Sequence, residues 1–527
     1  MAPSPRSAIL AVDLGTGGPK VALVSIEGEV VDSESEATDV VTLPGGGAEQ
    51  RPGDWWDATT AASRRLLARD PGRAATVRGV ALTGQWAGTV AVDSGGEPLC
   101  DAVIWLDSRG APHVRRRAGG PLRVAGYGPR KLVRWIRLTG GAPSLSGRDS
   151  LGHVLWLRAE RPEVYAAAAH FLEPVDWLGL KLTGRAATTW VTATLHWATD
   201  NRDIGRVRYH DGLLALAGLE RGKLPELLPT NAVLGPLTDG ARSALGVADA
   251  VPVVAGTPDT MSAAVGSGAV ADHAAHLYVG TSSWLSCHVP NKRTDPLHAI
   301  ASLPAAVPGR YLVSSEQETA GASLERLRDV LLPGSGSGGV AELGRLAAEA
   351  PAGSGGVLFT PWLNGERTPV DDRLIRGGLH NLSLDTGRAQ VARSVFEGVA
   401  LNARWMQHYV ERFCRRRLDP VAFVGGGALS PVWGQIMADV LGRTVRRMAD
   451  PVNVGVRGAG LLAWLALGEL EARDLEGRAR AAATHEPAPV HRETYERLFE
   501  AFRALYKANR SVRGRLAAVR EGEEGER

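Results

Sequence analysis

The sequence predicts an α/β protein built from two large, related lobes. One observation is a repeated turn: an apolar run ends at Asp13-Leu14-Gly15-Thr16, and a second, about half a chain later, ends at Gly280-Thr281-Ser282. Each copy has the pattern strand, Gly-Thr turn, strand. The other observation is size, because 527 residues, 44% of them hydrophobic, exceed what one hydrophobic core usually holds and suit two.

The repeated turns indicate anion binding. Glycine allows the backbone to approach an anion closely, while successive N–H groups and a hydroxyl point toward it. We therefore expect Gly15 and Thr16 in the first turn, and Gly280, Thr281 and Ser282 in the second, to contact phosphate. A single copy would be read as an ordinary hairpin, whereas two copies suggest two lobes that face one polyphosphate.

Charge and composition favour a small-molecule partner. The 60 basic and 57 acidic residues are spread along the chain and leave a formal net charge of +3, so no field favours nucleic acid or a membrane surface. The segment from Met1 to Ser7 leaves no room for an apolar signal core. Apolar stretches such as Leu461 to Leu467 fall well short of the roughly 18 residues that cross a bilayer. We expect a soluble protein.

The three cysteines favour a reducing compartment. Cys100, Cys287 and Cys414 are odd in number and far apart, which fits neither a disulfide framework nor a CxxC metal site. His273 and His276 would share a face only on a helix, whereas their segment reads as a strand and no third ligand is evident. We therefore expect no metal there and a cytoplasmic location.

The first lobe begins as an antiparallel meander. Strands are expected from Ala8, from Lys20 to Ile26 and from Val30. A helix should follow from Asp54, as its N-cap, with apolar residues at helical spacing until Pro71. Further strands are expected at 77–83, 89–93 and 98–105, and the looser stretch 140–240, with several tryptophans, predicts helices that cap this lobe.

A buried strand that starts at Val251 marks the expected beginning of the second lobe. It ends at Thr257-Pro258-Asp259, and a small, apolar, helix-compatible run follows it. We therefore divide the chain into an N-terminal domain at 1–249, a C-terminal domain at 250–473 and a C-terminal helical extension at 474–527 with a disordered end.

A glycine run in the second lobe is a candidate nucleotide site. An apolar strand at 421–424 leads into Gly425-Gly426-Gly427, and Ser430 precedes a helix. The free N–H groups and the dipole at a helix N-terminus favour phosphate, although a tight βα loop would have the same pattern.

Two other nucleotide-binding motifs are disfavoured. Residues 334–339 match GxGxxG formally, but they follow a helical stretch rather than a strand, so we expect a surface loop. The chain also has no GxxxxGK[ST] run, which argues against a P-loop kinase or ATPase.

Two aspartates are candidates for phosphoryl transfer, which needs Mg²⁺ and a base that orients the acceptor hydroxyl. Asp13 ends the first strand directly before its turn, so we assign it to Mg²⁺, through water; a turn-stabilising aspartate is the alternative. Asp259 ends a buried strand and begins a helix, whose dipole helps to keep the carboxylate ionised. We assign it as the base because it precedes the second turn by about twenty residues, and an ordinary N-cap is the alternative.

Polar and aromatic residues near predicted strand ends are candidates for binding the acceptor. Gln85 and Trp86 lie where substrate contacts concentrate in α/β folds. A glutamine can bind sugar hydroxyls and a tryptophan can stack on a carbon face, and a core position is the alternative for Trp86. Trp105, Asp107 and Arg109 form a compact group, for which a local salt bridge is the alternative.

These motifs, taken in order, give the chain a resemblance to the FGGY family of carbohydrate kinases. It is most similar to the xylulokinase-like members, over nearly its whole length. Each stretch is weak alone, and the ordered set is specific. The matching stretches are Asp13-Leu14-Gly15-Thr16, Gly84-Gln85, Trp105 with Asp107 and Arg109, Gly256 to Asp259, Gly280-Thr281-Ser282, Pro361 to Pro369, Glu397-Gly398 and Gly425 to Ser430.

The resemblance implies two actin-like, ribonuclease H-fold domains with sugar and MgATP in the cleft between them. It implies that Asp259 takes the proton from the acceptor hydroxyl, that the Gly-Thr turns hold the phosphates, and that Gly426 and Gly427 lie against the adenosine. Domain closure would exclude water and align the acceptor with the γ-phosphate, which can supply on the order of 7 to 11 kcal/mol. Dimers are common in the family, and by that analogy alone we expect a homodimer.

Three departures from the family pattern are visible. Xylulokinases usually have Met-His after the glutamine, where this chain has Trp86-Ala87, and Asn after the catalytic aspartate, where it has Thr260. Gly17-Gly18-Pro19 replaces a Thr/Ser-Gly-Val piece of the first turn, although Lys20 is retained. We expect an ATP-dependent kinase for a ketose or polyol, a xylulose-like sugar, and leave D-xylulose itself open. The alternative is a catalytically weak ATP- and sugar-binding regulatory protein.

Overall fold

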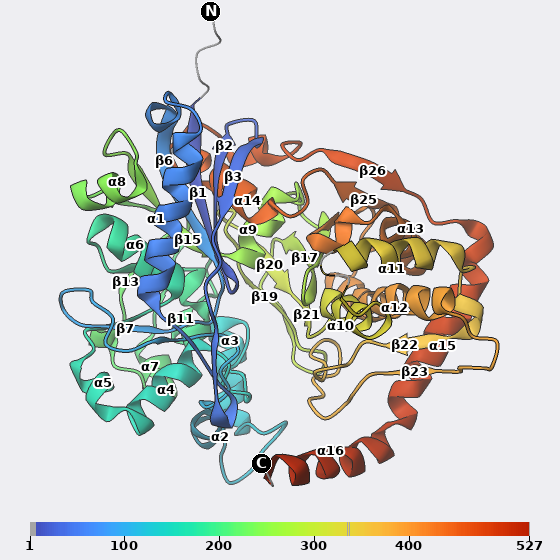
Figure 1. Ribbon diagram of the computed structural model, residues 1–527. Helices are drawn as coiled ribbons and strands as arrows, with labels where there is room; N and C mark the ends of the chain where they lie inside the picture. Colours follow the sequence, from blue (N-terminus) through green and yellow to red (C-terminus); the bar gives the residue numbers. More distant parts are fainter. Residues whose placement is uncertain (1–6, 335, 337, 526–527) are drawn as a thin grey trace, which may run out of the picture.

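The computed structural model describes residues 7–334, 336 and 338–525, and it contains two large β-sheets, each covered by helices (Figure 1). The first sheet has six strands in the order β14-β15-β6-β1-β2-β3. Their bounds are β1 Ala8–Gly15, β2 Gly18–Ser25, β3 Val30–Ser35, β6 Val77–Gly84, β14 Val233–Pro236 and β15 Pro252–Pro258.

The second sheet has nine strands in the order β18-β19-β20-β17-β16-β24-β25-β26, with β21 paired to β17. Their bounds are β16 Ala275–Val279, β17 Ser283–Val289, β18 Thr294–Asp295, β19 Ile300–Pro304, β20 Tyr311–Ser314, β21 Glu316–Gln317, β24 Val421–Val424, β25 Val445–Met448 and β26 Ala481–His485.

Both sheets are built around the same motif. Antiparallel β1 and β2 meet at the pair Gly15 and Gly18, and antiparallel β16 and β17 meet at the pair Val279 and Ser283. A parallel strand then lies beside the first member of each hairpin, β6 beside β1 and β24 beside β16. The predicted α/β fold with two related lobes, each opening on a Gly-turn hairpin, is therefore confirmed.

Helix α1, Pro52–Ala68, packs on the first sheet through Trp55, Ala62 and Leu66, which are spaced to lie on one face. The helix begins at Pro52 rather than after Asp54, because proline suits the first helical position. Asp54 lies in the first turn instead, where a carboxylate interacts favourably with the helix dipole.

A helical region caps the first lobe, as the sequence predicts for 140–240. Its core contains Trp135, Trp156 and Trp197. The helices of this lobe after α1 are α2 Ala111–Ala118, α3 Pro129–Thr139, α4 Ser150–Glu160, α5 Pro162–Ala167, α6 Pro174–Thr183, α7 Asp211–Ala217 and α8 Asp239–Leu245. Short strands that pair outside the two large sheets are β4 Val41–Leu43, β5 Gly47–Gln50, β7 Val90–Val92, β8 Ala102–Val103, β9 His170–Leu172, β10 Ala187–Thr189, β11 Thr199–Asp200, β12 Arg208–Tyr209, β13 Glu226–Leu228, β22 Leu358–Thr360 and β23 Gly378–His380.

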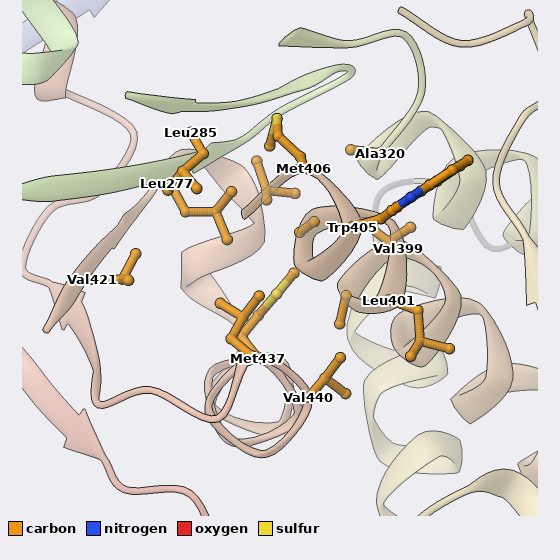
Figure 2. Packing of buried hydrophobic residues seen from close by; sticks show 14 of the residues in the cluster. Leu277, Leu285, Ala320, Val399, Leu401, Trp405, Met406, Val421, Met437 and Val440 are labelled. Carbon is orange, nitrogen blue, oxygen red and sulfur yellow. The ribbon is translucent and has the colours of Figure 1, made fainter. Parts of the chain in front are cut away.

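The core of the second lobe surrounds the long helix α12, Arg388–Cys414, which is buried along most of its length. Figure 2 shows its residues between the strands that carry Leu277 and Leu285 and the helix α13, Pro431–Leu441, that carries Met437 and Val440. The helices α10 Gly321–Leu331 and α11 Gly338–Glu349 also belong to this lobe. Of the loop expected at 334–339, residues 338 and 339 belong instead to the start of α11, and residues 335 and 337 lie outside the described part of the chain.

Strand β15 belongs to the first sheet, where it pairs with β6 and β14. The domain boundary expected at 250 falls before this strand, because the sequence of a buried apolar strand does not reveal which sheet the strand joins. Helix α9, Asp259–Gly266, follows β15 directly. We therefore propose that the boundary between the domains lies between α9 and β16.

Helices α9 and α14 cross in close contact. Helix α14, Val454–Ala466, follows the second sheet in sequence, yet it packs on β1, β2 and β6 of the first (Figure 1). A Cβ at Gly458 would overlap the carbonyl oxygen of Ser262, and a Cβ at Gly266 would overlap that of Val454. The two helices thus run in opposite directions at a separation that only glycine permits.

The C-terminal extension expected to be helical includes strand β26, which pairs with β25 of the second sheet, and its remaining part is mainly helical. Helix α15, Arg492–Ala508, buries Tyr495, Phe499 and Phe502 against the second lobe. Helix α16, Arg510–Gly525, extends into the segment for which disorder was expected, and residues 526 and 527 lie outside the described part. No helix in the described residues is long and apolar enough to cross a membrane.

We predict that Gly458→Ala destabilises the protein. Alanine improves helix propensity by about 1 kcal/mol, but overpacking against a fixed backbone carbonyl typically costs about 1–3 kcal/mol. The expected result is a lower midpoint of thermal or urea denaturation. Gly514→Ala in α16 is the matched control, because a Cβ there meets no atom within 4 Å, and it should leave the midpoint unchanged or raise it. An unchanged midpoint for Gly458→Ala would show that the helices can move apart freely.

Candidate active site

A pocket of about 330 Å³ lies between the two lobes. Its first-lobe side includes the turn after β1, the segment after β6 and the cap, and its second-lobe side includes the turn before β17. Among the residues expected to bind ligand, the pocket is lined by Thr16, Gln85, Trp86, Trp105, Asp259 and Ser282.

Asp259 is the first residue of α9 and is partly exposed to the pocket. Its Oδ1 accepts a hydrogen bond from the backbone N–H of Thr260 at 2.7 Å. Burial raises the pKa of Asp259 to about 7, and the negative charge of Asp13 adds to the effect. The carboxylate therefore lies at a strand–helix junction with a pKa suited to exchanging a proton near neutral pH.

Asp13 lies in β1, opposite Lys20 of β2. Its side chain rests against Gly455 in the first turn of α14, where a Cβ would overlap the carboxylate oxygen Oδ2. Burial raises the pKa of Asp13, and the positive charge of Lys20 opposes this shift only in part. The Nζ of Lys20 also donates a hydrogen bond to the carbonyl of Val452 at 2.8 Å. Asp13 and Asp259 thus form an electrostatically repelling pair that a cation would stabilise.

Hydrogen bonds connect the first turn to the acceptor side of the pocket. The Nε1 of Trp105 donates to Oγ1 of Thr16 at 2.9 Å. Gln85 donates from its backbone N–H to the carbonyl of Leu14 at 2.9 Å and from its side chain to Oε1 of Gln50 at 2.8 Å. The turn, Gln85 and Trp105 are therefore held as one unit.

Trp86 lines the pocket and donates from Nε1 to the carbonyl of Thr192 at 3.1 Å. Ala87, which also lines it, has a left-handed backbone conformation with φ of 62°. The buried carboxylate of Glu173 accepts the N–H of Gly88 at 2.9 Å and so fixes the next residue. These contacts set the direction in which residues 86 and 87 face the pocket.

Asp107 is fully buried and is not among the residues that line the pocket. Its carboxylate accepts the N–H of Ala48 at 2.9 Å, and the N–H and Nε of Arg109 at 2.8 Å each. The guanidinium of Arg109 in turn stacks on Trp156. This arrangement matches the local salt bridge considered as the alternative, and we assign Asp107 a supporting position beneath Trp105.

The second turn is held from behind by α10. The N–H of Gly280 donates to the carbonyl of Ser282 at 2.9 Å, and the carbonyls of Gly280 and Thr281 accept the N–H groups of Gly321 and Ala320. Of the turn, Ser282 lines the pocket, while Thr281 is exposed to solvent.

The glycine run lies beyond the second turn, against the end of β16. Gly425 has a φ of 85°, and a Cβ there or at Gly427 would collide with Val279. Gly426 is exposed and has no atom within 4 Å of its Cβ position, so its backbone is open to a ligand. Ser430 caps α13 by accepting the N–H of Trp433 at 3.2 Å, which leaves its O–H able to donate.

A group of charged residues lines the second-lobe side of the pocket, and the sequence patterns did not identify it as a substrate-binding group. Arg367 and Arg373 pair with Glu318, and Arg148 of the cap reaches the same carboxylate at 3.8 Å. Burial would raise the pKa of Glu318, but these three arginines outweigh it and hold the pKa below its ordinary value. The one available signal was the Pro361 to Pro369 stretch, which contains Arg367.

Two further tryptophans and an aspartate complete the pocket. Asp149 caps α4 through the N–H of Gly152 at 3.0 Å and accepts Nε1 of Trp197 at 2.7 Å. Trp284 of β17 stacks on Tyr278 at 3.8 Å between ring centroids. Trp197 and Trp284 bring the number of tryptophans that line the pocket to four, with Trp86 and Trp105 as the other two. Indole rings beside charged groups suit a ligand with hydroxyl groups on a carbon skeleton.

Curated relatives cover the whole chain. It is 28% identical to a xylulose kinase of Staphylococcus epidermidis strain RP62A over 523 residues, which span 98% of this chain and 99% of the relative. It is 29% identical to the xylulose kinase of Escherichia coli strain K12 over 501 residues, or 94% and 98% of the two chains. The structure of ligand-bound xylulose kinase from Lactobacillus acidophilus matches with a TM-score of 0.85 at 22% identity, covering 97% of this chain and 100% of that one.

Kinases with other names match as well. An autoinducer-2 kinase of Enterobacter sp. strain 638 is 26% identical over 527 residues, covering 95% of this chain and 94% of the relative. The structure of gluconate kinase from Lactobacillus acidophilus has a TM-score of 0.85 at 22% identity, with 97% of this chain and 99% of that chain covered. The shared fold therefore accommodates more than one named acceptor.

Family models match both lobes. Residues 8–266 match the N-terminal domain of the FGGY family of carbohydrate kinases, and residues 275–467 match its C-terminal domain. The junction between the two matches lies between α9 and β16, as the hydrogen bonding of β15 suggests. The chain belongs to the FGGY family of carbohydrate kinases.

Proposed function

We propose that this sugar kinase transfers the γ-phosphoryl group of ATP to a hydroxyl of a ketose or polyol related to xylulose. The observation that carries the proposal is Asp259, a carboxylate at a helix N-terminus in the pocket between the lobes, together with Thr16 and Ser282 of the two turns. The proposed reaction forms a bond between the acceptor oxygen and the γ-phosphorus and breaks the bond from that phosphorus to the β-phosphate oxygen. ADP leaves, and the acceptor proton passes to Asp259.

The environment of Asp259 supports its role as the base. A pKa raised to about 7 by burial and by Asp13 leaves part of the carboxylate ionised at neutral pH and makes it a better proton acceptor than an exposed aspartate. The hydrogen bond from the N–H of Thr260 fixes one oxygen, so the other is free to face the acceptor hydroxyl.

The second lobe supports the donor side of the proposal. Ser282 lines the pocket, and the open backbone at Gly426 lies at the C-terminal end of β24, the parallel neighbour of β16. Ligands in α/β sheets bind beyond the carboxyl ends of such strands. We assign the phosphates to the two turns and the adenosine to the face at Gly426 and Gly427.

Asp13 would hold Mg²⁺, through water. Oxygen donors suit this ion, and the partial compensation of Asp13 by Lys20 leaves negative charge beside Asp259 that a divalent cation would neutralise. When bound, the ion would neutralise charge on the phosphates of ATP. Gly455 provides the space that the Asp13 carboxylate occupies, because a Cβ at position 455 would overlap its Oδ2.

The acceptor is the open part of the proposal. A volume of about 330 Å³ is at the small end for ligand sites and suits a monosaccharide or alditol, for which the tryptophans offer stacking faces and the charged group offers hydrogen bonds. Trp86, Ala87 and Thr260 stand where xylulokinases usually have methionine, histidine and asparagine. We therefore propose an alditol or a less common ketose ahead of D-xylulose.

Asp259→Asn should abolish most of the turnover. The amide keeps the shape of the side chain but cannot accept the proton, so we expect kcat to fall by about 10² to 10⁴. The measurement is ADP release with the preferred acceptor, alongside calorimetric titration of ATP and acceptor as a control for binding. A variant that binds both ligands and keeps kcat within about tenfold of the parent would exclude Asp259 as the base.

Asp13→Asn should raise the Mg²⁺ requirement. Removing one charge weakens attraction for the cation, so we expect the Mg²⁺ concentration for half-maximal activity to rise and kcat at saturating ATP to fall. A titration of ADP release against Mg²⁺ measures both. Asp249→Asn is the matched control, because Asp249 is exposed and does not line the pocket, and it should leave the Mg²⁺ dependence unchanged. Equal Mg²⁺ dependence in the parent and Asp13→Asn would refute the assignment.

A panel of ketoses, alditols and aldonic acids, assayed by ADP release, should give the highest kcat/KM with a compound other than D-xylulose. Restoring a donor with the double substitution Trp86→Met and Ala87→His should raise kcat/KM for D-xylulose by about tenfold, the value of one good hydrogen bond. Histidine tolerates the left-handed conformation of position 87 better than most residues. Tight ATP binding with no transfer to any compound would instead favour the regulatory protein, and a parent that prefers D-xylulose would contradict our assignment of the acceptor.

A further inference from the structure

Three potential metal ligands meet in the second lobe, away from the pocket between the lobes. His273 precedes β16, Cys287 lies in β17, and Cys414 is the last residue of α12. Their ligand atoms all lie within 4.8 Å of one another. Sequence spacing does not indicate this cluster, because Cys287 and Cys414 are widely separated in the chain and the three residues belong to no spacing motif.

The separation of the two sulfurs suits a shared metal ion. The Sγ atoms of Cys287 and Cys414 are 3.7 Å apart. Two thiolates bound to one tetrahedral Zn²⁺ at about 2.3 Å each lie about 3.8 Å from one another. A disulfide needs a separation of about 2.05 Å, so the thiols would have to move toward each other by well over an ångström to form one.

His273 supplies a third donor with no other partner. Its Nδ1 is buried and accepts or donates no hydrogen bond among the described residues. The backbone holds the residue in place, because its N–H donates to the carbonyl of His288 at 2.8 Å in a left-handed conformation with φ of 65°. A buried polar atom without a partner is rare, and one ring nitrogen of His273 lies within 4.8 Å of both sulfurs, where a bound metal would give the imidazole a partner.

We propose that His273, Cys287 and Cys414 form a binding site for a thiolate-preferring divalent cation of the zinc class. Two sulfurs and one imidazole nitrogen would fill three positions of a tetrahedron, and the fourth would take water. The ion would connect β17, whose first residue follows the second phosphate turn, to the end of α12 and to the segment before β16. The site is therefore distinct from the Mg²⁺ position assigned to Asp13 and does not depend on the proposed function.

The test is to titrate the reduced, full-length protein with Co²⁺, which reports thiolate ligation by its charge-transfer absorption, and then to displace it with Zn²⁺. We expect one equivalent of Co²⁺ to bind with that absorption. Cys414→Ser and His273→Asn should each weaken Zn²⁺ binding by roughly 100-fold or more, since even residues behind a metal ligand contribute 10- to 100-fold. Asparagine is chosen because it accepts the left-handed backbone of position 273.

Cys100→Ser is the matched control, because Cys100 is a free cysteine outside the cluster and its replacement should leave both measurements unchanged. Circular dichroism of each variant checks that it is folded. Absence of thiolate-to-cobalt absorption in the folded parent, or its survival in both Cys414→Ser and His273→Asn, would overturn the proposal. A parent purified without reductant whose mass is two hydrogens lower, and which binds no Co²⁺ after reduction, would show that the pair is a disulfide-forming site instead.

Discussion

The crossing of α9 and α14 is the contact on which the arrangement of the site depends. Glycines at 266 and 458 let two helix backbones approach so closely that a single methyl group on either would meet a carbonyl oxygen. Helix α9 carries Asp259 at its first residue, and α14 presents Gly455 to Asp13. The same crossing therefore fixes both carboxylates and joins a helix that follows the second sheet to the face of the first.

Burial of negative charge is the second constraint. Burial raises the pKa of both Asp13 and Asp259, because the surrounding protein is a poor substitute for water, and the charge of Asp13 raises the pKa of Asp259 further. On the other side of the pocket, three arginines outweigh the cost of burying the carboxylate of Glu318 and keep it ionised. The first pair is thus suited to exchange protons and attract cations, while the second cluster is a fixed array of charge.

Local patterns predicted much of this architecture. Glycines and apolar alternation identified both hairpins, and Thr257-Pro258-Asp259 marked the strand–helix junction, because these signals lie within a few residues. Contacts between distant segments leave no such local signal. Examples are the pairing of β15 with the first sheet, the hydrogen bond between Asp149 and Trp197, and the proximity of His273 to two cysteines. Asp107 was assigned to the ligand because a sequence does not tell which way a carboxylate faces at a strand end.

The placement of β15 in the first sheet has a consequence for motion. Asp259 belongs to the same rigid layer as Thr16 and Gln85, whereas Ser282 and Gly426 are carried by the other sheet. A rotation of one sheet relative to the other would keep the distances among the residues of each sheet and would change only the distances between residues of different sheets. A substitution far from the pocket that alters how the two sheets rotate relative to each other would then change the separation of Asp259 and Ser282 without touching a residue that lines the pocket.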